Sequence, residues 1–517
     1  MESDGVLQLP DALTLERLRE EVGSRLEIHR AEVRRMKFWD TFEWGIWFGG
    51  CVLFSSGGVC RLCRREVGEI GPVICEEEES GAKFRFPRDF RAASMREKLL
   101  ELTGLRALAP VASATFRQRQ ADFRNETGKI VCRFEWAEVA GMKDHHPLRY
   151  CRILPLRGYE AEAAGLEGVL VGLGAEAATG TPLDFVFRSA GNIPRKYTLQ
   201  PAFGLGTMTP AREAIGRIIR AMLAIARGNE AGIVSDLDTE FLHDYRICLR
   251  KIRSVLSLVK GVYPEDDTLR MRKILGDLAR ETNRLRDLDV YLLARDEYSA
   301  LLPEVFRADL GVMFRDFEAE RAGVVRKVSA RLRSPAWREA IEEVERFVAE
   351  GASPLPSHAS NFAVGPLVFR RISKRYRKIC DIADKLGPET PDEGVHRLRI
   401  ECKKLRYLME FFGELIPGEE SEVMEKQLRR LQNRLGGFND CSVQQRFLLD
   451  YWSHRKSGLD VALALGGLVS ILHLRQQQHR VRIHKALDAF CCAATASTFK
   501  QTFKPPAVGM VPENAAP

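Results

Sequence analysis

FLHDYRICLRKIRSVLSLV, at Phe241–Val259, recurs as GVHRLRIECKKLRYLMEFF at Gly394–Phe412 of this 517-residue chain. The two stretches align without a gap at an offset of 153 residues (396 − 243), and the same offset still matches Asp287 with Asp440. A register kept over so many residues indicates an internal duplication. The identical pairs within the two stretches are His243/His396, Arg246/Arg399, Ile247/Ile400, Lys251/Lys404 and Arg253/Arg406.

Both stretches have the apolar spacing of a helix, and each carries a basic stripe beside its apolar face. At about 100° per residue, four basic positions of each copy fall within an arc of roughly 80°. Like charges on one stripe repel each other by a few tenths of a kcal/mol per neighbouring pair, and no acidic residue in the stripe relieves that repulsion. We therefore expect a polyanionic ligand. The stripes consist of His243, Arg246, Arg250 and Arg253 in the first copy and of His396, Arg399, Lys403 and Arg406 in the second.

The motif His-x-x-Arg-(x)3-[Arg/Lys]-Lys-x-Arg, present twice, resembles the CHAD family, the conserved histidine α-helical domain. The resemblance extends from about Thr209 to Phe490 and includes RLRDLDV at Arg284–Val290 and GGFNDCSV at Gly436–Val443. It implies a helical bundle that binds inorganic polyphosphate in a basic central cavity without catalysing a reaction. The residues expected to bind polyphosphate are the two stripes together with Lys251 and Lys404. Further lining is expected from Arg217, Arg220, Arg280, Arg284, Lys374 and Arg375.

The composition is that of an ordinary globular protein. The net charge of +8 is modest for this length, so the local concentration of charge matters more than its total. No secretory signal or membrane-spanning helix is apparent, because the apolar run Val461–Leu474 is too short to cross a bilayer. The 12 cysteines have no regular spacing and suit reduced thiols. We expect a cytoplasmic protein that has no membrane partner and no cofactor. The resemblance implies an association with polyphosphate granules. Whether the chain forms a homo-oligomer is left open.

The N-terminal region has a different texture, with short β-rich runs separated by glycines and one helix at Ala93–Leu105. Trp44–Phe54 and Leu183–Phe187 are expected to be strands. MKFWDTFEWGIWFGG at Met36–Gly50 and TGKIVCRFEWAEV at Thr127–Val139 resemble the CYTH family, the triphosphate tunnel fold. Enzymes of that fold carry an N-terminal Glu-x-Glu-x-Lys strand and later paired acidic residues that hold a divalent metal against a triphosphate.

The acidic pattern of those enzymes is missing here. The first strand region, Gly5–Pro10, has no acidic pair and no lysine, and the late strand Arg149–Gly158 has no carboxylate. Because magnesium needs at least one or two carboxylates, we expect a degenerate relative without catalytic residues, or a different α+β fold. Cys60-x-x-Cys63 is too little for a zinc site unless His145, His146 and Cys151 complete it, so no metal is expected.

The sequence thus predicts an antiparallel, β-rich α+β domain followed by an all-α duplicated bundle. Three alternatives to polyphosphate binding remain. One is a triphosphatase fed by the bundle. Another is a nucleic-acid-binding module, which is unlikely because the stripes lack the aromatic residues that stack on bases. The third is a helical scaffold without a ligand. The expected segments are an α+β domain over 1–200, helical repeats over 205–350 and 367–493, a linker over 351–366 and a flexible tail over 494–517.

Overall fold

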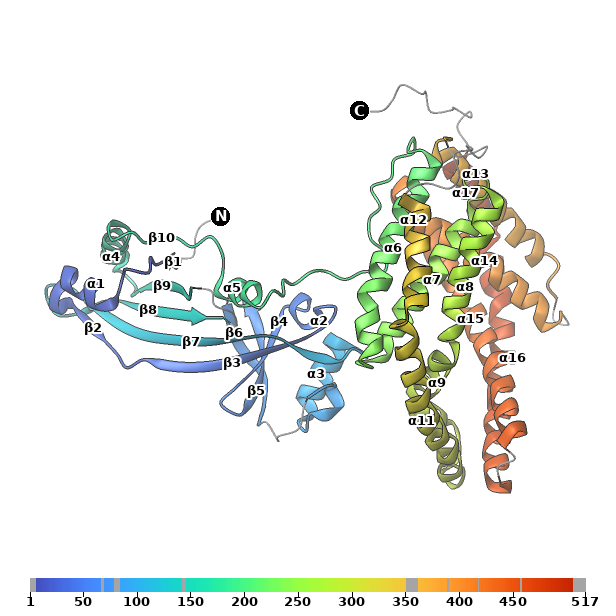
Figure 1. Ribbon diagram of the computed structural model, residues 1–517, viewed down its shortest axis with the longest axis horizontal. Coiled ribbons are helices and arrows are strands. Elements are labelled where there is room, and N and C mark those ends of the chain that lie inside the picture. The colour runs from blue at the N-terminus through green and yellow to red at the C-terminus, as the bar shows by residue number, and fades with distance from the viewer. Residues whose placement is uncertain are drawn as a thin grey trace. The chain divides into compact units, whose positions relative to one another are not determined.

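The computed structural model describes residues 6–66, 69–78, 84–141, 146–349, 361–387, 390–416, 418–455 and 458–504. The chain forms two compact units, Met1–Tyr197 and Thr198–Pro517. The first is β-rich and antiparallel and the second is helical, which confirms the predicted fold class (Figure 1).

The N-terminal unit is built on one antiparallel sheet with the strand order β10-β1-β9-β8-β7-β3-β4-β5-β6, and β2 also pairs with β7. Helices α1 and α4 cover one end of a face of this sheet, and α2 and α3 pack at the other end. The strands are β1 Val6–Gln8, β2 Leu26–Ile28, β3 Glu32–Thr41, β4 Cys51–Ser56, β5 Val59–Glu66, β6 Glu69–Glu78, β7 Leu108–Arg124, β8 Ile130–Ala140, β9 Leu148–Pro155 and β10 Glu176–Ala177. The helices are α1 Leu15–Val22, α2 Gly45–Phe48, α3 Ala93–Thr103, α4 Glu160–Gly172 and α5 Pro182–Ser189.

Two expected strands of this unit are wrong in whole or in part. The run Leu183–Phe187 lies inside helix α5, and Trp44–Phe54 begins with the short helix α2 before β4. Helix α5 starts because the Thr181 hydroxyl accepts the Asp184 N–H while the Asp184 carboxylate accepts the Thr181 N–H. This reciprocal capping box satisfies two amides at the helix start and outweighs the β propensity of the apolar run.

The helical unit confirms the duplication residue by residue. Helices α6, α7 and α8 begin at residues 211, 239 and 265, and their counterparts α13, α14 and α15 begin 153 residues later, at 364, 392 and 418. One hydrophobic core contains residues of both halves. The helices are α6 Ala211–Val234, α7 Thr239–Leu258, α8 Glu265–Glu281, α9 Asn283–Leu293, α10 Arg295–Leu301, α11 Glu304–Leu332, α12 Pro335–Ala349, α13 Val364–Ala383, α14 Asp392–Phe412, α15 Gly418–Arg455, α16 Leu459–Phe490 and α17 Ala493–Thr502.

The ends of the second repeat differ from expectation. Most of the predicted linker, residues 351–360, lies outside the described residues, and α13 already begins at Val364. The predicted flexible tail starts with helix α17, whose Phe499 and the following Phe503 are buried in the main core. Tyr376 of α13 stacks on Phe499 with ring centroids 4.0 Å apart, and this contact fixes α17 against the bundle.

Helix α16 is longer than the apolar run that the sequence analysis considered. By length and composition it could cross a membrane, because an 18-residue window of the helix has a mean hydropathy of 1.3. Of the residues in that window, 33% are buried. Core helices of globular proteins pass the same test, and α16 packs along α15 and against α11.

Candidate functional site

The two duplicated helices, α7 and α14, pack against each other, and their basic stripes meet. Arg250 of α7 is exposed, and its charge acts on Arg399 and Lys403 of α14 and on Arg246 of its own helix. The two stripes therefore converge on one region of positive charge instead of pointing apart into solvent.

Lys403 is the most perturbed member of this region. Burial, together with the charges of Arg399, Arg250 and Arg406, lowers the pKa of its ammonium from 10.5 to about 8, against a smaller opposing effect of Asp440. A cation that is partly removed from water and surrounded by cations of two helices is unfavourable in the free protein. An anion bound beside it would relieve both costs.

The equivalent arginines of the two copies are held differently. Arg246 donates to the Ala279 carbonyl and the Thr282 hydroxyl, both at 2.6 Å, and to Asn283 Oδ1 at 2.8 Å. All three acceptors lie at the junction around Thr282, where α8 ends and α9 begins. In the second copy α15 runs on without a break. Arg399 Nε is accordingly buried without an acceptor in the described part of the chain.

Carboxylates at the duplicated position 287/440 lie beside the arginines of both copies. Asp440 lies 3.7 Å from Arg399 and is exposed. Burial raises the pKa of Asp287, although Arg246, Arg284 and Arg286 act in the opposite direction. Arg286 lies 3.9 Å from Glu240, and its Nη1 has no hydrogen-bond acceptor among the described residues. Orphaned guanidinium donors beside a cationic stripe are the expected signature of an anion site.

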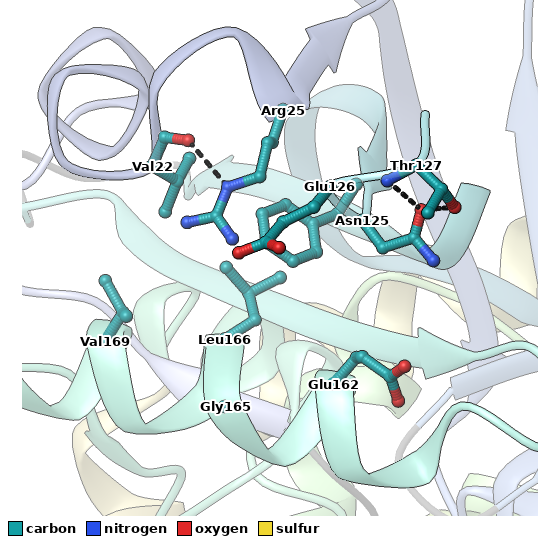
Figure 2. A pocket seen from close by; sticks show the side chains of 10 residues that line it. Val22, Arg25, Asn125, Glu126, Thr127, Glu162, Gly165, Leu166 and Val169 are labelled. Atoms are coloured by element: carbon teal, nitrogen blue, oxygen red, sulfur yellow. Dashed lines mark hydrogen bonds between the residues drawn. The ribbon is translucent and has the colours of Figure 1, made fainter. Parts of the chain in front are cut away.

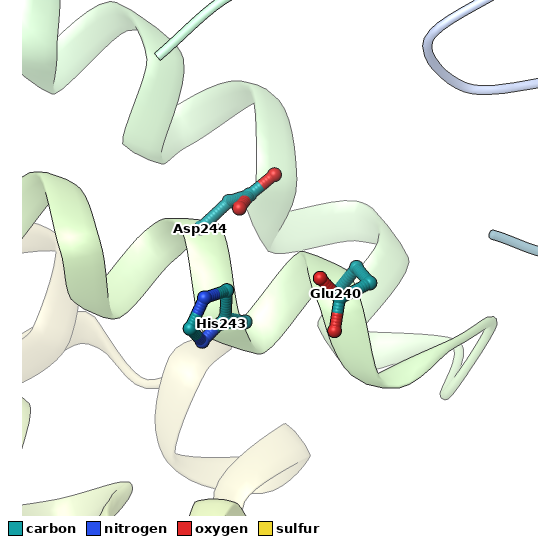
Figure 3. Close-up of side chains that lie close together, drawn as sticks. All are labelled: Glu240, His243 and Asp244. Atoms are coloured by element: carbon teal, nitrogen blue, oxygen red, sulfur yellow. The ribbon is translucent and has the colours of Figure 1, made fainter. Parts of the chain in front are cut away.

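The two histidines lie near the N-terminal ends of α7 and α14. His396 is exposed, and its Nδ1 lies 2.8 Å from Asn439 Oδ1. His243 has acidic neighbours on its own helix, Glu240 and Asp244, and the side chains of all three lie close together in Figure 3. Their ligand atoms lie within 4.8 Å of one another, a spacing that would suit a metal ion.

Three of the predicted binding residues are instead held by carboxylates. Lys404 and Arg375 both donate to the buried carboxylate of Glu401, at 2.9 and 2.6 Å, and Lys378 donates to it at 3.0 Å. Burial raises the pKa of Glu401, but these cations outweigh burial and lower it overall. Lys251 is buried and donates to the Leu199 carbonyl at 2.8 Å, with Glu410 at 3.6 Å. These side chains fasten helices and chain segments together.

The additional residues suggested as lining are also mostly occupied. Arg284 forms a two-point ion pair with Glu320, at 2.6 and 2.5 Å, that leaves little of its charge for a ligand. The others are placed as follows: Arg217 pairs with Glu213 and Arg280 with Asp277, Arg220 donates to the Val348 carbonyl, and Lys374 is exposed on α13. Of the stripe residues themselves, Arg406 pairs with Glu410, and Arg253 lies against Gly276 of α8.

A basic group on α15 and α16 lies outside the predicted set of binding residues. His479 packs against Gly437, where an added Cβ would lie 2.4 Å from the ring and would displace it. Burial and the charges of Arg482, Arg434 and Arg475 lower the pKa of His479, whereas Asp440 raises it. Asp440 therefore acts on both this group and Lys403. The repeat offset could not reveal the group, because it comes from the packing of α15 on α16.

Among the described residues of the N-terminal unit, no three metal-ligating side chains lie close together. Strands β1 and β9 hold no carboxylate, and Glu135 and Glu138 of β8, three residues apart, lie on opposite faces of the sheet. Cys60 and Cys63 also belong to cores on opposite faces and cannot share one zinc ion. His145 lies outside the described residues.

A cavity of about 520 Å³ lies beside the turn between β7 and β8 of this unit (Figure 2). Val169 and Leu166 of α4 form its apolar wall, and Arg25 donates to the Val22 carbonyl at its rim. Glu126 and Glu162 share the lining with that single arginine, so the cavity has no consistent charge that would select an anion or a metal.

Comparison with known proteins identifies the helical unit. The family model of the CHAD domain matches residues 217–449. The helical unit contains a CHAD domain. Two uncharacterized proteins of Mycobacterium tuberculosis, MT2285 and Rv2226, are each 26% identical over 217 residues, 40% of this chain. The match spans about 40% of the length of these relatives.

Solved structures were also compared. The CHAD domain of the plant Ricinus communis is 22% identical and aligns over 56% of this chain and 96% of its own, with a TM-score of 0.49. PptA from Streptomyces chartreusis is 18% identical over 54% of this chain and 99% of its own, with a TM-score of 0.40. HpAC1 from Hippeastrum, described with a dominant triphosphatase activity, is 16% identical over 36% of this chain and 95% of its own, with a TM-score of 0.26.

Proposed function

We propose that the CHAD domain of this protein binds inorganic polyphosphate without hydrolysing it, at the region where Arg250, Arg399 and Lys403 meet. The observation that carries the proposal is the packing of α7 on α14, which brings basic residues of both duplicated helices together and, with burial, lowers the pKa of Lys403 to about 8. A chain of phosphates lying across these residues would supply one negative charge per phosphate and acceptors for the orphaned guanidinium donors.

The site favours a polyanion without bases. Phe241, Tyr245 and Tyr407, three aromatic residues of the two motif stretches, are buried. Tyr245 stacks on Trp337, and Tyr407 stacks on Phe411, so neither ring is free to receive a base. Single-stranded nucleic acids gain about 1–3 kcal/mol per stacked base. A site without stacking platforms therefore favours polyphosphate over RNA at equal charge.

A filter-binding titration of the full chain with long-chain polyphosphate tests the proposal. The variant Arg250→Gln/Lys403→Gln removes one cation of each helix from the convergent region and should weaken binding at least tenfold. The matched control is Arg217→Gln/Arg284→Gln, which removes two arginines already paired with Glu213 and Glu320 and should change the affinity less than twofold.

Three results would contradict the proposal. Equal losses in the two double variants would mean that binding follows net charge alone. Equal affinity for single-stranded RNA in a competition experiment would favour a nucleic-acid module. An affinity independent of salt would exclude neutralisation of phosphates as the basis of binding.

A further inference from the structure

Helix α16 has an apolar stripe that none of the described helices covers. Leu459, Leu463, Leu474 and Val481 are 75%, 52%, 63% and 74% exposed. Gly466, Ser470 and Gln477 lie between them and are exposed as well. The spacing of three or four residues places all seven positions on one face of the helix. Large apolar side chains aligned along an exposed face mark an interaction surface more often than chance exposure does.

The positions of the stripe have the same spacing in both directions along the helix. Its positions are symmetric about Ser470, with residues 459 and 481, 463 and 477, and 466 and 474 at equal distances on either side. In an antiparallel pair of such helices, Leu459 would meet Val481 of a second copy, and Leu474 would meet Gly466. Gly466 has open space where a Cβ would stand, so it can receive the leucine.

We propose that α16 forms a twofold-symmetric, antiparallel contact with α16 of a second copy of this chain. A twofold interface requires a self-complementary surface, and the charges at the rim satisfy that requirement. At about 100° per residue, Asp460 and Arg482 lie on the same edge of the stripe, roughly 80° and 120° from Ser470. The twofold operation places each Asp460 near the partner's Arg482.

A second copy suits this surface better than a lipid bilayer does. The face of α16 opposite the stripe is buried in the cores shared with α15 and α11, so the helix cannot leave the bundle to enter a membrane. Ser470 and Gln477 interrupt the apolar residues, and Asp460 stands at the rim, where an anionic lipid surface would repel it. The stripe is roughly 33 Å long, which gives a small interface, and small interfaces are typical of weak, reversible association.

Sedimentation of the full chain over a range of micromolar concentrations, without polyphosphate, tests the contact. Leu474→Glu should raise the dimer dissociation constant at least tenfold, whereas Leu269→Glu, at a leucine of α8 that is 51% exposed, should leave it unchanged. Asp460→Arg and Arg482→Asp should each weaken the dimer, and the double variant should restore it. A wild-type chain that stays monomeric throughout would overturn the proposal, as would equal effects of the two leucine variants.

Cysteine cross-linking tests the geometry independently, in a Cys492→Ser background that removes the exposed native thiol. Ser470→Cys should cross-link to itself with a short reagent, because Ser470 lies at the twofold axis. Gln477→Cys alone should not, but it should cross-link to Leu463→Cys in a mixture of the two proteins. Self-linking of Gln477→Cys as efficient as that of Ser470→Cys would indicate a parallel or random contact and refute the proposal. Binding to anionic phospholipid vesicles that Leu474→Glu abolishes, with no cross-linked dimer, would also refute it.

Discussion

Replacing Lys403 with methionine should make the free protein more stable and its ligand complex weaker. Burial and neighbouring arginines hold the pKa of Lys403 at about 8 instead of 10.5. At about 1.4 kcal/mol per pKa unit this difference corresponds to roughly 3 kcal/mol at neutral pH. Because the side chain is only partly buried and water screens part of the repulsion, we expect a gain of about 1–2 kcal/mol for Lys403→Met.

The pH dependence follows from the sign of the pKa change. Between pH 8 and 10.5 the unfolded chain keeps the Lys403 proton that the folded chain has released, so this group makes stability rise with pH. The advantage of Lys403→Met is therefore largest at neutral pH and disappears by about pH 10.5. Urea unfolding followed by far-UV circular dichroism at pH 7 and pH 10 measures the difference. Lys327→Met, at an exposed lysine of α11, is the control and should alter neither value.

Ligand binding should reverse the order of stability. Long-chain polyphosphate stabilises the charged form of Lys403, so wild-type protein should gain more thermal stability from the ligand than Lys403→Met does. Wild-type protein should also take up protons on binding above pH 8, which calorimetry in buffers of different ionisation enthalpy detects. A variant no more stable than wild type at pH 7, or an unchanged difference at pH 10, would refute the assignment of Lys403 to the convergent site.

Three further outcomes are expected. Glu401→Gln should destabilise the helical unit by about 3 kcal/mol, measured by urea unfolding, because it leaves three cations around a buried position without their carboxylate. Burial raises the pKa of Asp40 to about 6, so the stability of the N-terminal unit should fall by about 2–3 kcal/mol as the pH rises from 4 to 6, and Asp40→Asn should remove that dependence in tryptophan-monitored unfolding. Tripolyphosphate with magnesium or manganese should release no phosphate above background, and activity lost on replacing Glu138 would contradict the non-catalytic interpretation.

The sequence predicted the duplication, the helices and the convergent stripes because these features depend on local periodicity. A helical wheel places Arg250 on the basic face of α7 and Lys403 and Arg399 on the basic face of α14. The packing of α7 on α14 then brings the two faces together. The wheel does not show what lies opposite a side chain. Arg284 looks like a ligand-binding residue in the sequence, yet Glu320 of α11 neutralises it. Lys404 looks like one too, but it pairs with Glu401 of its own helix, whose carboxylate also holds Arg375 and Lys378 of α13.

Predictions from local composition were also wrong where a helix cap or a contact with the distant core decided the structure. The run Leu183–Phe187 has the composition of a strand, but the capping box at Thr181 makes it a helix. The segment after residue 494 looks frayed by composition, but Phe499 and Phe503 find a place in the core that only the assembled bundle provides. Both errors arise because single-residue propensities are weaker than a satisfied helix start or a buried aromatic ring.

The two copies have diverged at their equivalent arginines. In the first copy Arg246 donates to the Ala279 carbonyl and the Thr282 hydroxyl at the junction between α8 and α9. In the second copy α15 continues through the equivalent position, so Arg399 has no such carbonyl to satisfy and keeps an unpartnered donor. The same residue type at the same repeat position is therefore held at a helix junction in one half, whereas in the other half its Nε is buried without an acceptor among the described residues.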